Sequence, residues 1–558
     1  MSRVKKKGFI AIFLILCGVA LLFTGAKGAL LRDYAYLLMG GRPSRLAKSY
    51  TPAQRDTLGY RMADSIRRRR TEIFAELAFP YPPKHLTGDF FSAGPEPYSL
   101  LIPQRKGAAK DLPNPRKVSE VLFKRRTFIP EPRLSALTPF LANFVIESLF
   151  ETTGKPSMIR FPRGFVPYKK PNGYNAASRY LDLYPVYHRS EMLRSYVDGK
   201  MWMHKVKVNG KWELFPPLLS EVKKKYPHFT MDNPLKKPED KLFATGTKRG
   251  NLHTVMMGYI TLFLRTHNAL CDQLKQRYPK MNDEQLFRKS RNIVLALFVK
   301  FVWEVYISKL ITPGINPAKF SPDLFKFPLG YITPYELNIA YAWHSFIPDG
   351  IVLKKKKLSL RKMGYNSKPL LAHGLRAIFA SLSQQKAGKI GLYNTSKHLR
   401  DDPLGPVGRL DVEAITIQKT RDLRLGSYND YRRELFRKEG YTKWSQFSPD
   451  KRVQKDLASL YKSPDDVDLY VGIMSSTHEK GTALPVGVYR FFLFTILQCV
   501  WSNPFFRNYL TKKNLTPYGY RLFQKQQGLD FLKIGLSKDL RGIHFTFPKK
   551  SKTAVLQK

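Results

Sequence analysis

The chain has 558 residues, of which 43% are hydrophobic and 13% aromatic, so it is long enough for a large core and too apolar to be disordered. Its 95 Lys and Arg residues against 43 Asp and Glu give a formal net charge of +52, which indicates an anionic partner such as a membrane surface or nucleic acid. The basic residues are spread along the chain, and this distribution favours a generally basic surface over a dedicated nucleic-acid site. Three cysteines without CxxC or zinc spacing exclude a disulfide framework.

The N-terminal region has the composition of a membrane-attached segment. Residues 1–7 are basic and residues 9–24 are almost wholly apolar, which is typical of a cleaved signal or a retained anchor. Lys27 interrupts the small residues that cleavage requires, so we expect residues 1–30 to form a retained signal anchor or transmembrane segment. Residues 31–116 contain two amphipathic stretches with cationic flanks and then a Pro- and Gly-rich stretch. These stretches are expected to dock on a membrane surface or, alternatively, to pack on the domain behind them.

The remainder of the chain is dominated by helical periodicity, so the expected fold class is mainly α. Few strands are expected, and residues 157–250 are predicted to be rich in loops with scattered short elements. Asn282 and Gln285 form a capping box. His267 lies near an apolar stripe, which predicts a satisfied core histidine, and the Cys271 thiol is expected to be buried and inert. Helices are predicted over residues 138–154, 252–278, 286–311, 334–349, 372–385, 411–425, 427–440, 453–461 and 487–501.

One predicted helix, residues 334–349, carries a pair of residues suited to redox chemistry. Thr333 is its expected N-cap, and Glu336 completes a capping box. Tyr341 and His344 are three residues apart, so they would share one face of the helix. A neutral imidazole can bind haem iron and a nearby phenol can carry a radical. The same spacing is also compatible with a core tyrosine and a satisfied core histidine.

Common nucleotide-binding and hydrolase motifs are missing from the sequence. There is no GxxxxGK[ST] loop, no GxGxxG after a strand, no HExxH and no GxSxG. A Ser/His/Asp site has no required spacing, so it is not excluded by this search, but nothing in the sequence favours it.

Several longer segments resemble the animal haem peroxidase family, in particular its cyclooxygenase and fatty-acid dioxygenase branch. The resemblance covers most of the chain and implies a large helical catalytic domain over residues 117–541, followed by a basic tail over residues 542–558. The segments that carry it are LDLYPVYHRSEMLRSYVDGKMWM (181–203), ITLFLRTHNALCDQLKQRYPKMNDEQLFRKSRNIV (260–294), NIAYAWHSFIPD (338–349) and RDLRLGSYNDYRRELF (421–436).

The resemblance assigns roles to four residues on what would be the proximal side of a haem. His344, in the segment similar to the family's YxWHxxxPD pattern, would be the iron ligand. Tyr341 would carry the radical, and Tyr306 would hydrogen-bond to it. Tyr470 would support the iron-binding histidine from behind.

On the distal side the sequence departs from the family. The family's glutamine and histidine, four residues apart, are replaced by Asn143 and Glu147. Glu147 could do the acid–base work of the missing histidine if burial raises its pKa; alternatively it faces solvent beside Glu151, and peroxidase activity is weak or lost. In the helix that would line the fatty-acid channel, Ile496 occupies the position of the family's serine, next to Thr495.

The resemblance therefore implies a membrane-associated, haem-dependent oxygenase that uses a tyrosyl radical to add dioxygen to an unsaturated fatty acid, with peroxidase activity either kept or weakened. The expected partners are a lipid or fatty-acid substrate and an anionic membrane surface. Nucleic acid has only composition in its favour. Relatives of this branch are often dimers, although no interface can be identified in the sequence. The alternative function is that of a degenerate haem-peroxidase-fold protein that binds lipid or protein at a membrane.

Overall fold

A computed structural model describes residues 96–105, 111–162, 164–177, 181–311, 333–403, 408–436, 438–479, 481–492, 510–537 and 539–547. The predicted anchor, most of the predicted docking region, the basic tail beyond residue 547 and the channel residues Thr495 and Ile496 lie outside these residues. Within the described ranges, no helix is long and apolar enough to cross a membrane.

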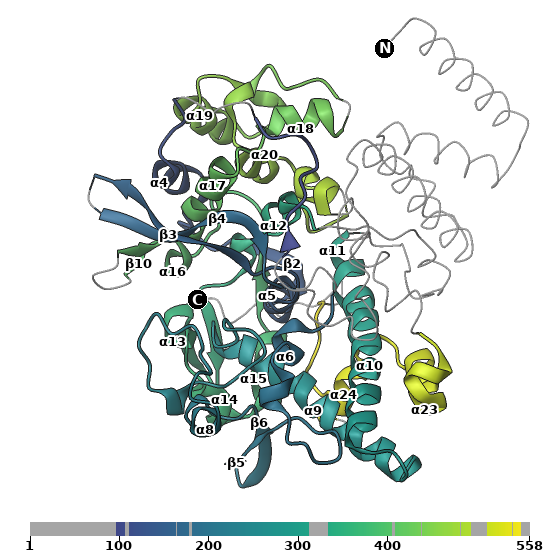
Figure 1. Ribbon diagram of the computed structural model, residues 1–558. Coiled ribbons are helices and arrows are strands. Elements are labelled where there is room, and N and C mark those ends of the chain that lie inside the picture. The colour runs from purple at the N-terminus through teal and green to yellow at the C-terminus, as the bar shows by residue number, and fades with distance from the viewer. Residues whose placement is uncertain are drawn as a thin grey trace, which may run out of the picture.

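The core is built around three helices, and it confirms the predicted mainly helical class. α9 (Thr254–Arg277) and α10 (Asp283–Phe301) form a hairpin, and α5 (Leu137–Leu149) packs against α9 at the centre of the molecule (Figure 1). Phe144, Phe263 and Phe298, one from each helix, meet with ring centroids 5.0 to 5.8 Å apart. All three side chains are fully buried, and each stabilises the fold by roughly 1.5–3 kcal/mol.

The residues around the α9–α10 hairpin behave as predicted. Asn282 and Gln285 form the expected capping box, with reciprocal hydrogen bonds of 2.9 and 3.1 Å. His267 is a buried core histidine that contacts the Tyr187 hydroxyl and the Gly199 carbonyl, each at 2.9 Å. The Cys271 thiol is buried, and burial raises its pKa to about 12, so it stays protonated.

The helix predicted over residues 286–311 is not regular throughout. α10 ends at Phe301 and continues as a π-helical segment, η4 (Val302–Ile307), before α11 (Ser308–Ile311). In a π-helix each backbone N–H bonds five residues back, so the side chains are turned relative to their α-helical positions. This local change sets the direction of Tyr306.

The helix predicted over residues 334–349 is much shorter in the structure. α12 (Tyr335–Ala340) begins after Pro334 and stops before Tyr341, while His344 lies in a separate 3₁₀ turn, η6 (His344–Phe346). Glu336 does not cap the helix: its buried carboxylate accepts hydrogen bonds from the Leu101 N–H at 2.8 Å and the Tyr431 hydroxyl at 2.7 Å. These tertiary partners compete successfully with the local capping box.

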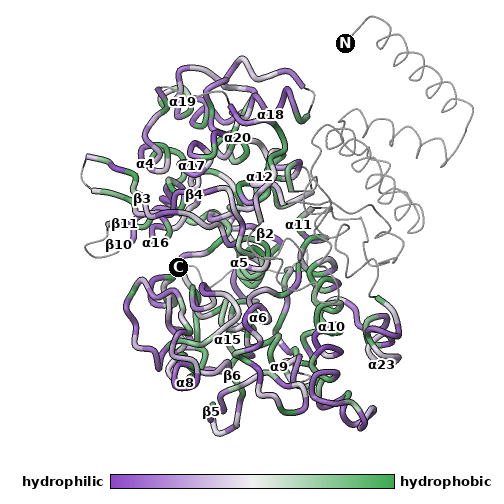
Figure 2. The backbone as a smooth tube through the Cα atoms, viewed as in Figure 1, coloured by the Kyte–Doolittle hydropathy of each residue, from purple (hydrophilic) through white to green (hydrophobic). Residues whose placement is uncertain are grey.

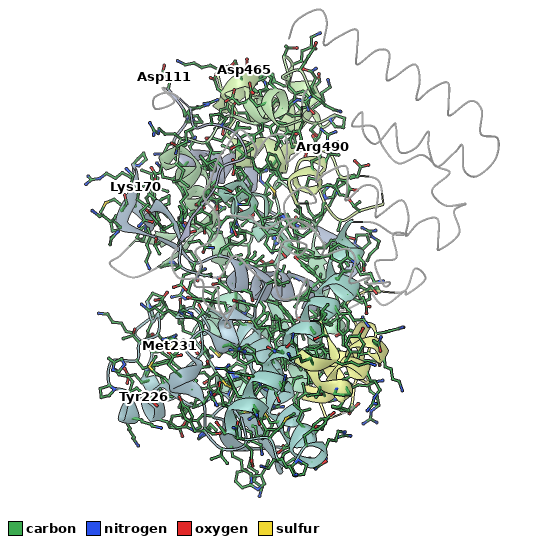
Figure 3. All side chains as sticks on the ribbon, turned by 45° about the vertical axis from the view of Figure 1, so that its right-hand side comes forward. Asp111, Lys170, Tyr226, Met231, Asp465 and Arg490 are labelled. Carbon is green, nitrogen blue, oxygen red and sulfur yellow. The ribbon has the colours of Figure 1, made fainter. Side chains whose placement is uncertain are left out.

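The scattered short elements expected over residues 157–250 are present, but the expectation of few strands missed a long hairpin. β3 (Thr152–Phe161) and β4 (Gly164–Asn175) form a long antiparallel hairpin, and β1 (Glu96–Pro97) pairs with β4. The predicted helix over 138–154 ends at Leu149 because the chain then enters β3. Lys170 projects from this sheet into solvent (Figure 3).

A second hairpin, β5 (His204–Val208) and β6 (Lys211–Phe215), turns at Asn209 and Gly210. Both turn residues have positive φ, +47° and +82°, which a two-residue hairpin turn requires. The Asn-Gly pair in the sequence is the signal for this turn.

Helices α17 (Val412–Asp422), α18 (Tyr428–Glu434), α19 (Lys451–Leu460) and α20 (Leu469–Ser475) lie on the side of α5 opposite α9 (Figure 1). α17, α18 and α19 correspond to the helices predicted over residues 411–425, 427–440 and 453–461, whereas α20 was not predicted. Figure 2 shows that α5, between these two groups, is strongly hydrophobic.

The helix predicted over residues 372–385 is divided at Gly374 into α14 (Lys368–His373) and α15 (Leu375–Ser383). Gly374 has φ +79°, a conformation that interrupts a helix and that glycine adopts without strain. Of the helix predicted over 487–501, residues 486–492 are helical and the rest lies outside the described ranges.

The remaining elements are short and cover the core. The strand pairs are β2 (Pro130–Ser135) with β9 (Lys386–Gly388), β7 (Gly350–Leu353) with β8 (Lys356–Ser359), and β10 (Asp402–Pro403) with β11 (Arg409–Leu410). The helical elements are α4 (Pro115–Val118), η2 (Ser119–Phe123), α6 (Tyr184–Tyr187), α7 (Ser190–Leu193), α8 (Leu219–Lys225), η3 (Glu239–Lys241), α13 (Leu360–Met363), α16 (Lys397–Arg400), η8 (Trp444–Gln446), η9 (Pro464–Asp466), α23 (Lys512–Lys525), η10 (Gly528–Phe531) and α24 (Leu532–Gly535).

Candidate active site

His344 is held with one ring nitrogen toward a carboxylate and the other available. Its Nδ1 lies 3.1 Å from Oε2 of Glu413, a hydrogen-bonding distance at an angle outside the range of a hydrogen bond. Nε2 makes no hydrogen bond with the described residues, and the side chain keeps 22% of its accessible surface although Trp343 and Ser345 beside it are buried. An imidazole in this state can bind a metal through Nε2.

Glu413 is a site residue that the sequence did not reveal. It lies in the first turn of α17, where an acidic residue is ordinarily explained by the helix dipole. In the structure it is fully buried, and its carboxylate accepts hydrogen bonds from the hydroxyls of Tyr470, at 2.6 Å, and Thr395. Tyr470 was expected to support His344 from behind. Its hydroxyl contacts Glu413 and the Ala342 carbonyl, at 2.8 Å, so it reaches the histidine through Glu413.

Tyr341 and Tyr306 form a buried phenol pair. Their hydroxyl oxygens are 2.7 Å apart, although the residues come from the end of α12 and from η4. The Tyr341 ring stacks on Phe492 with centroids 5.2 Å apart and touches Trp343 at 4.5 Å. Burial and the neighbouring phenol raise the pKa of Tyr306 well above its ordinary value, so it stays protonated. Tyr341 and His344 are near each other in the chain, but they do not share a helix face.

On α5, Glu147 is buried and paired. Its side chain is 1% exposed, and Oε1 lies 3.0 Å from an Nη of Arg249, whose side chain is 40% exposed. Burial raises the pKa of Glu147 to about 7; Arg249 opposes this rise, and Glu151 adds to it. The alternative in which Glu147 faces solvent is therefore wrong. Neither carboxylate oxygen has a hydrogen-bond partner among the described residues.

Asn143, one turn earlier on α5, is fixed by a histidine that the sequence did not identify. Eleven of the thirteen residues of α5 are buried, whereas Asn143 is partly exposed. The His253 Nδ1 accepts a hydrogen bond from the Met256 N–H, so Nε2 carries the proton and donates it to Asn143 Oδ1 at 2.8 Å. The amide N–H groups of Asn143 are thereby left for another acceptor. Burial lowers the pKa of His253 to about 3, which keeps the imidazole neutral.

These residues fall into two sets. The first joins His344, Glu413 and Tyr470, together with the Tyr341–Tyr306 pair next to it in the chain. The second joins Asn143 to His253 and Glu147 to Arg249. A single histidine with a free nitrogen, a buried oxidisable phenol and a carboxyl group that titrates near neutrality are suited to redox chemistry that also moves protons.

The model of the animal haem peroxidase family matches residues 148–507. The chain belongs to the animal haem peroxidase family. The match includes His344, Tyr341, Tyr306 and Tyr470, and it confirms the family that the sequence motifs predicted. Glu147 lies just before the first matched residue.

Among the curated proteins similar to this chain are prostaglandin G/H synthases. The chain is 29% identical to prostaglandin G/H synthase 2 of Bos taurus over 388 residues, which cover 68% of this chain and 59% of the relative. It is 30% identical to the Mus musculus enzyme of the same name over 374 residues, covering 65% and 56%. The match thus spans less than two thirds of these relatives.

The solved structures show the shared fold. Fatty acid alpha-dioxygenase of Oryza sativa superposes with a TM-score of 0.72 at 16% identity, covering 96% of this chain and 99% of the other. Peroxidase A of Dictyostelium discoideum gives a TM-score of 0.70 at 20% identity, with 84% and 99% covered.

Proposed function

We propose that this protein is a haem-dependent oxygenase that uses a radical on Tyr341 to add dioxygen to an unsaturated fatty acid at a membrane surface. The observation that carries the proposal is the buried Tyr341–Tyr306 pair, in which Tyr341 lies three residues before His344, whose Nε2 makes no hydrogen bond with the described residues. The relatives support it by name, since they are prostaglandin synthases and a fatty acid alpha-dioxygenase.

The described residues fit a haem. His344 would hold the iron through Nε2, backed by Glu413, and the partly exposed Asn143 and the buried Glu147 without a hydrogen-bond partner would face the opposite side. When bound, haem supplies a one-electron oxidant at the expense of a hydroperoxide. The protein supplies the axial ligand and the placement of the phenol and the proton-carrying groups.

The oxygenation itself is carried by Tyr341. Its phenoxyl radical takes a hydrogen atom from a substrate C–H bond, which leaves the phenol and a carbon radical. Dioxygen adds to that carbon, and the resulting peroxyl radical takes the hydrogen atom back from the Tyr341 hydroxyl. One fatty acid and one dioxygen thus become one hydroperoxide, and the phenoxyl radical is restored. The Tyr306 hydroxyl holds the reacting oxygen in place, and Phe492 and Trp343 exclude water.

Proton transfer to the hydroperoxide is assigned to Glu147. A carboxyl with a pKa near 7 can both accept a proton through Oε1 or Oε2 and return it to the leaving oxygen. Arg249 stabilises the ionised form of Glu147. The Asn143 amide, fixed by His253, would donate a hydrogen bond to the oxygen atoms of the hydroperoxide. In this arrangement Glu147 takes over the work of the histidine that the family places there.

The test combines spectroscopy with oxygen uptake on the full chain in detergent. The haem-supplied wild type is expected to show a Soret band that His344→Ala loses and His398→Ala, a change at a partly exposed histidine paired with Asp402, retains. Tyr341→Phe is expected to keep the band and to lose oxygen uptake with arachidonate or linoleate, while Tyr306→Phe keeps part of it. Absence of the band in wild type would refute haem binding. Equal uptake by wild type and Tyr341→Phe would remove Tyr341 from the mechanism, and haem binding without uptake would favour the degenerate, lipid-binding alternative.

A further inference from the structure

We propose that Glu413 is the anionic partner of the haem ligand, so that His344 binds iron with imidazolate character. The inference rests on the proposed role of His344 and goes beyond it, because it predicts the electronic state of the iron rather than its presence. Glu413 acts through His344, so it is a positioning and tuning residue.

The surroundings of Glu413 are those of a hydrogen-bond acceptor. It is fully buried, and both carboxylate oxygens face hydrogen-bond donors: Oε1 the Thr395 hydroxyl, and Oε2 the Tyr470 hydroxyl. A buried carboxylate is costly unless a positive group compensates it. Among the described residues, the only ionisable basic side chain within 4 Å of this carboxylate is His344.

Arg116, which contacts the start of α17, is already paired with other acids. Arg116 pairs with Asp411, the N-cap of α17, and with Asp401 at 2.7 Å. The charge of Arg116 is thus shared among Asp411, Asp401 and, at 3.7 Å, Glu120, so the positive charge that would compensate Glu413 is that of the iron bound through His344. Oε2 of Glu413 lies 3.1 Å from Nδ1 of His344, which is a hydrogen-bond distance. Only the angle at the Nδ1–H group falls outside the range of a hydrogen bond.

An anion close to Nδ1 changes how strongly Nε2 donates electrons to a bound metal. A carboxylate that accepts the N–H proton makes the imidazole a stronger electron donor, which fixes the ring and favours the more positive oxidation state of the iron. The hydroxyls of Tyr470 and Thr395 withdraw part of the charge from Glu413, so they moderate the effect. Removing the carboxylate charge and removing a donor to it should therefore shift the iron in opposite directions.

The experiment uses the full, haem-loaded chain and two readouts other than activity: the ferric/ferrous reduction potential and the iron–histidine stretching frequency of the ferrous form. Glu413→Gln is expected to raise the potential, lower the frequency and weaken haem retention about tenfold, measured by transfer to a haem-scavenging protein. Tyr470→Phe is expected to lower the potential. The exposed Glu434→Gln on α18 should match wild type.

The outcomes separate this inference from the proposed function. If Glu413→Gln folds and leaves both potential and frequency unchanged, Glu413 is a structural residue only and the inference is wrong. If His344→Ala keeps the wild-type haem spectrum, the assignment of the ligand fails first. Should Glu413→Gln fail to fold, Glu413→Asp, which keeps the charge, and Tyr470→Phe still decide: unchanged frequencies in both would overturn the inference.

Discussion

At the scale of single residues, Glu147 is buried and must still change between its ionised and protonated forms. Its pKa is near 7 because desolvation outweighs the attraction of Arg249, which is itself 40% exposed and therefore screened by solvent. A carboxyl in this balance is ionised in a large fraction of molecules at neutral pH and still protonates readily. That combination is what an acid–base group at a peroxide requires.

We predict that the rate of reaction with hydroperoxide rises with pH as Glu147 ionises, since only the ionised carboxylate accepts a proton. The rise should be centred near pH 7, and Glu147→Gln should abolish it and lower the plateau rate by about 10²-fold or more. Stopped-flow absorbance of the haem band between about pH 5.5 and 8.5 checks this. Glu151→Gln, one turn along and bonded to the Tyr184 hydroxyl at 2.9 Å, is the matched control and should keep the rise. A wild-type profile retained by Glu147→Gln would show that Glu147 is a bystander.

The sequence could predict some residues of the site and not others, for a physical reason. His344, Tyr341 and Tyr306 belong to recognisable chain segments, and the structure places Tyr341 and Tyr306 in hydrogen-bond contact. Their roles in catalysis stay predictions. Glu413, Arg249 and His253 act through contacts with residues 69 to 110 positions away in the chain. Nothing local marks such partners, because the tertiary fold alone brings them together.

At the scale of elements, the residue at the N-terminus of α9, His253, both caps this helix and fixes the position of Asn143. One nitrogen of His253 caps the helix and the other holds the amide, so a single side chain serves both purposes. Phe140 of α5 covers the ring with centroids 4.9 Å apart.

Two substitutions should separate these two purposes. His253→Ala is expected to lose the cap, about 0.5–2 kcal/mol of unfolding free energy, and also the hold on Asn143. His253→Asn can still cap through its side-chain oxygen but is too short to reach Asn143, so it should keep more stability and show the same drop in hydroperoxide reactivity. Denaturant unfolding and stopped-flow rates measure the two effects. Equal reactivity of His253→Asn and wild type would contradict the role given to the His253–Asn143 contact.

The regular helices were the elements that the sequence predicted best. The 3.6-residue apolar period marked α9 and α10 because both have long buried faces. The β3–β4 hairpin was missed because its strands are stabilised by each other and by α17 rather than by an alternating pattern of their own. The break at Tyr341 was missed because the partners of Glu336 lie far away in the chain.

At the scale of the whole molecule, the fold followed from the family resemblance, while the charge calls for a partner outside the protein. The basic residues behind the net charge of +52 are spread along the chain, and Lys170 is one of those exposed on the surface (Figure 3). Spread-out basic charge attracts an anionic surface over a broad area rather than at one point.

We therefore predict that the full chain binds vesicles containing phosphatidylserine and that this binding falls steeply as salt rises from about 0.05 to 0.5 M, because the screening length shortens. Co-sedimentation measures it, with neutral phosphatidylcholine vesicles as the control. Equal, salt-independent binding to both kinds of vesicle would show that apolar insertion rather than charge provides the attachment. Duplex DNA that displaces the protein from the vesicles at low concentration would revive nucleic acid as a partner.

The π-helical turn at Val302–Ile307 has a consequence for how chains of this kind are aligned. A π turn holds one residue more than regular α winding over the same length, so it is equivalent to a one-residue insertion within a continuous helix. Beyond it, every side chain is turned by about a quarter of a circle relative to an uninterrupted helix. If this sequence is aligned without a gap to a chain that lacks the π turn, Tyr306 is matched with a residue whose side chain points in another direction. The phenol pair at Tyr341 thus depends on the number of residues in this helix as much as on their identity.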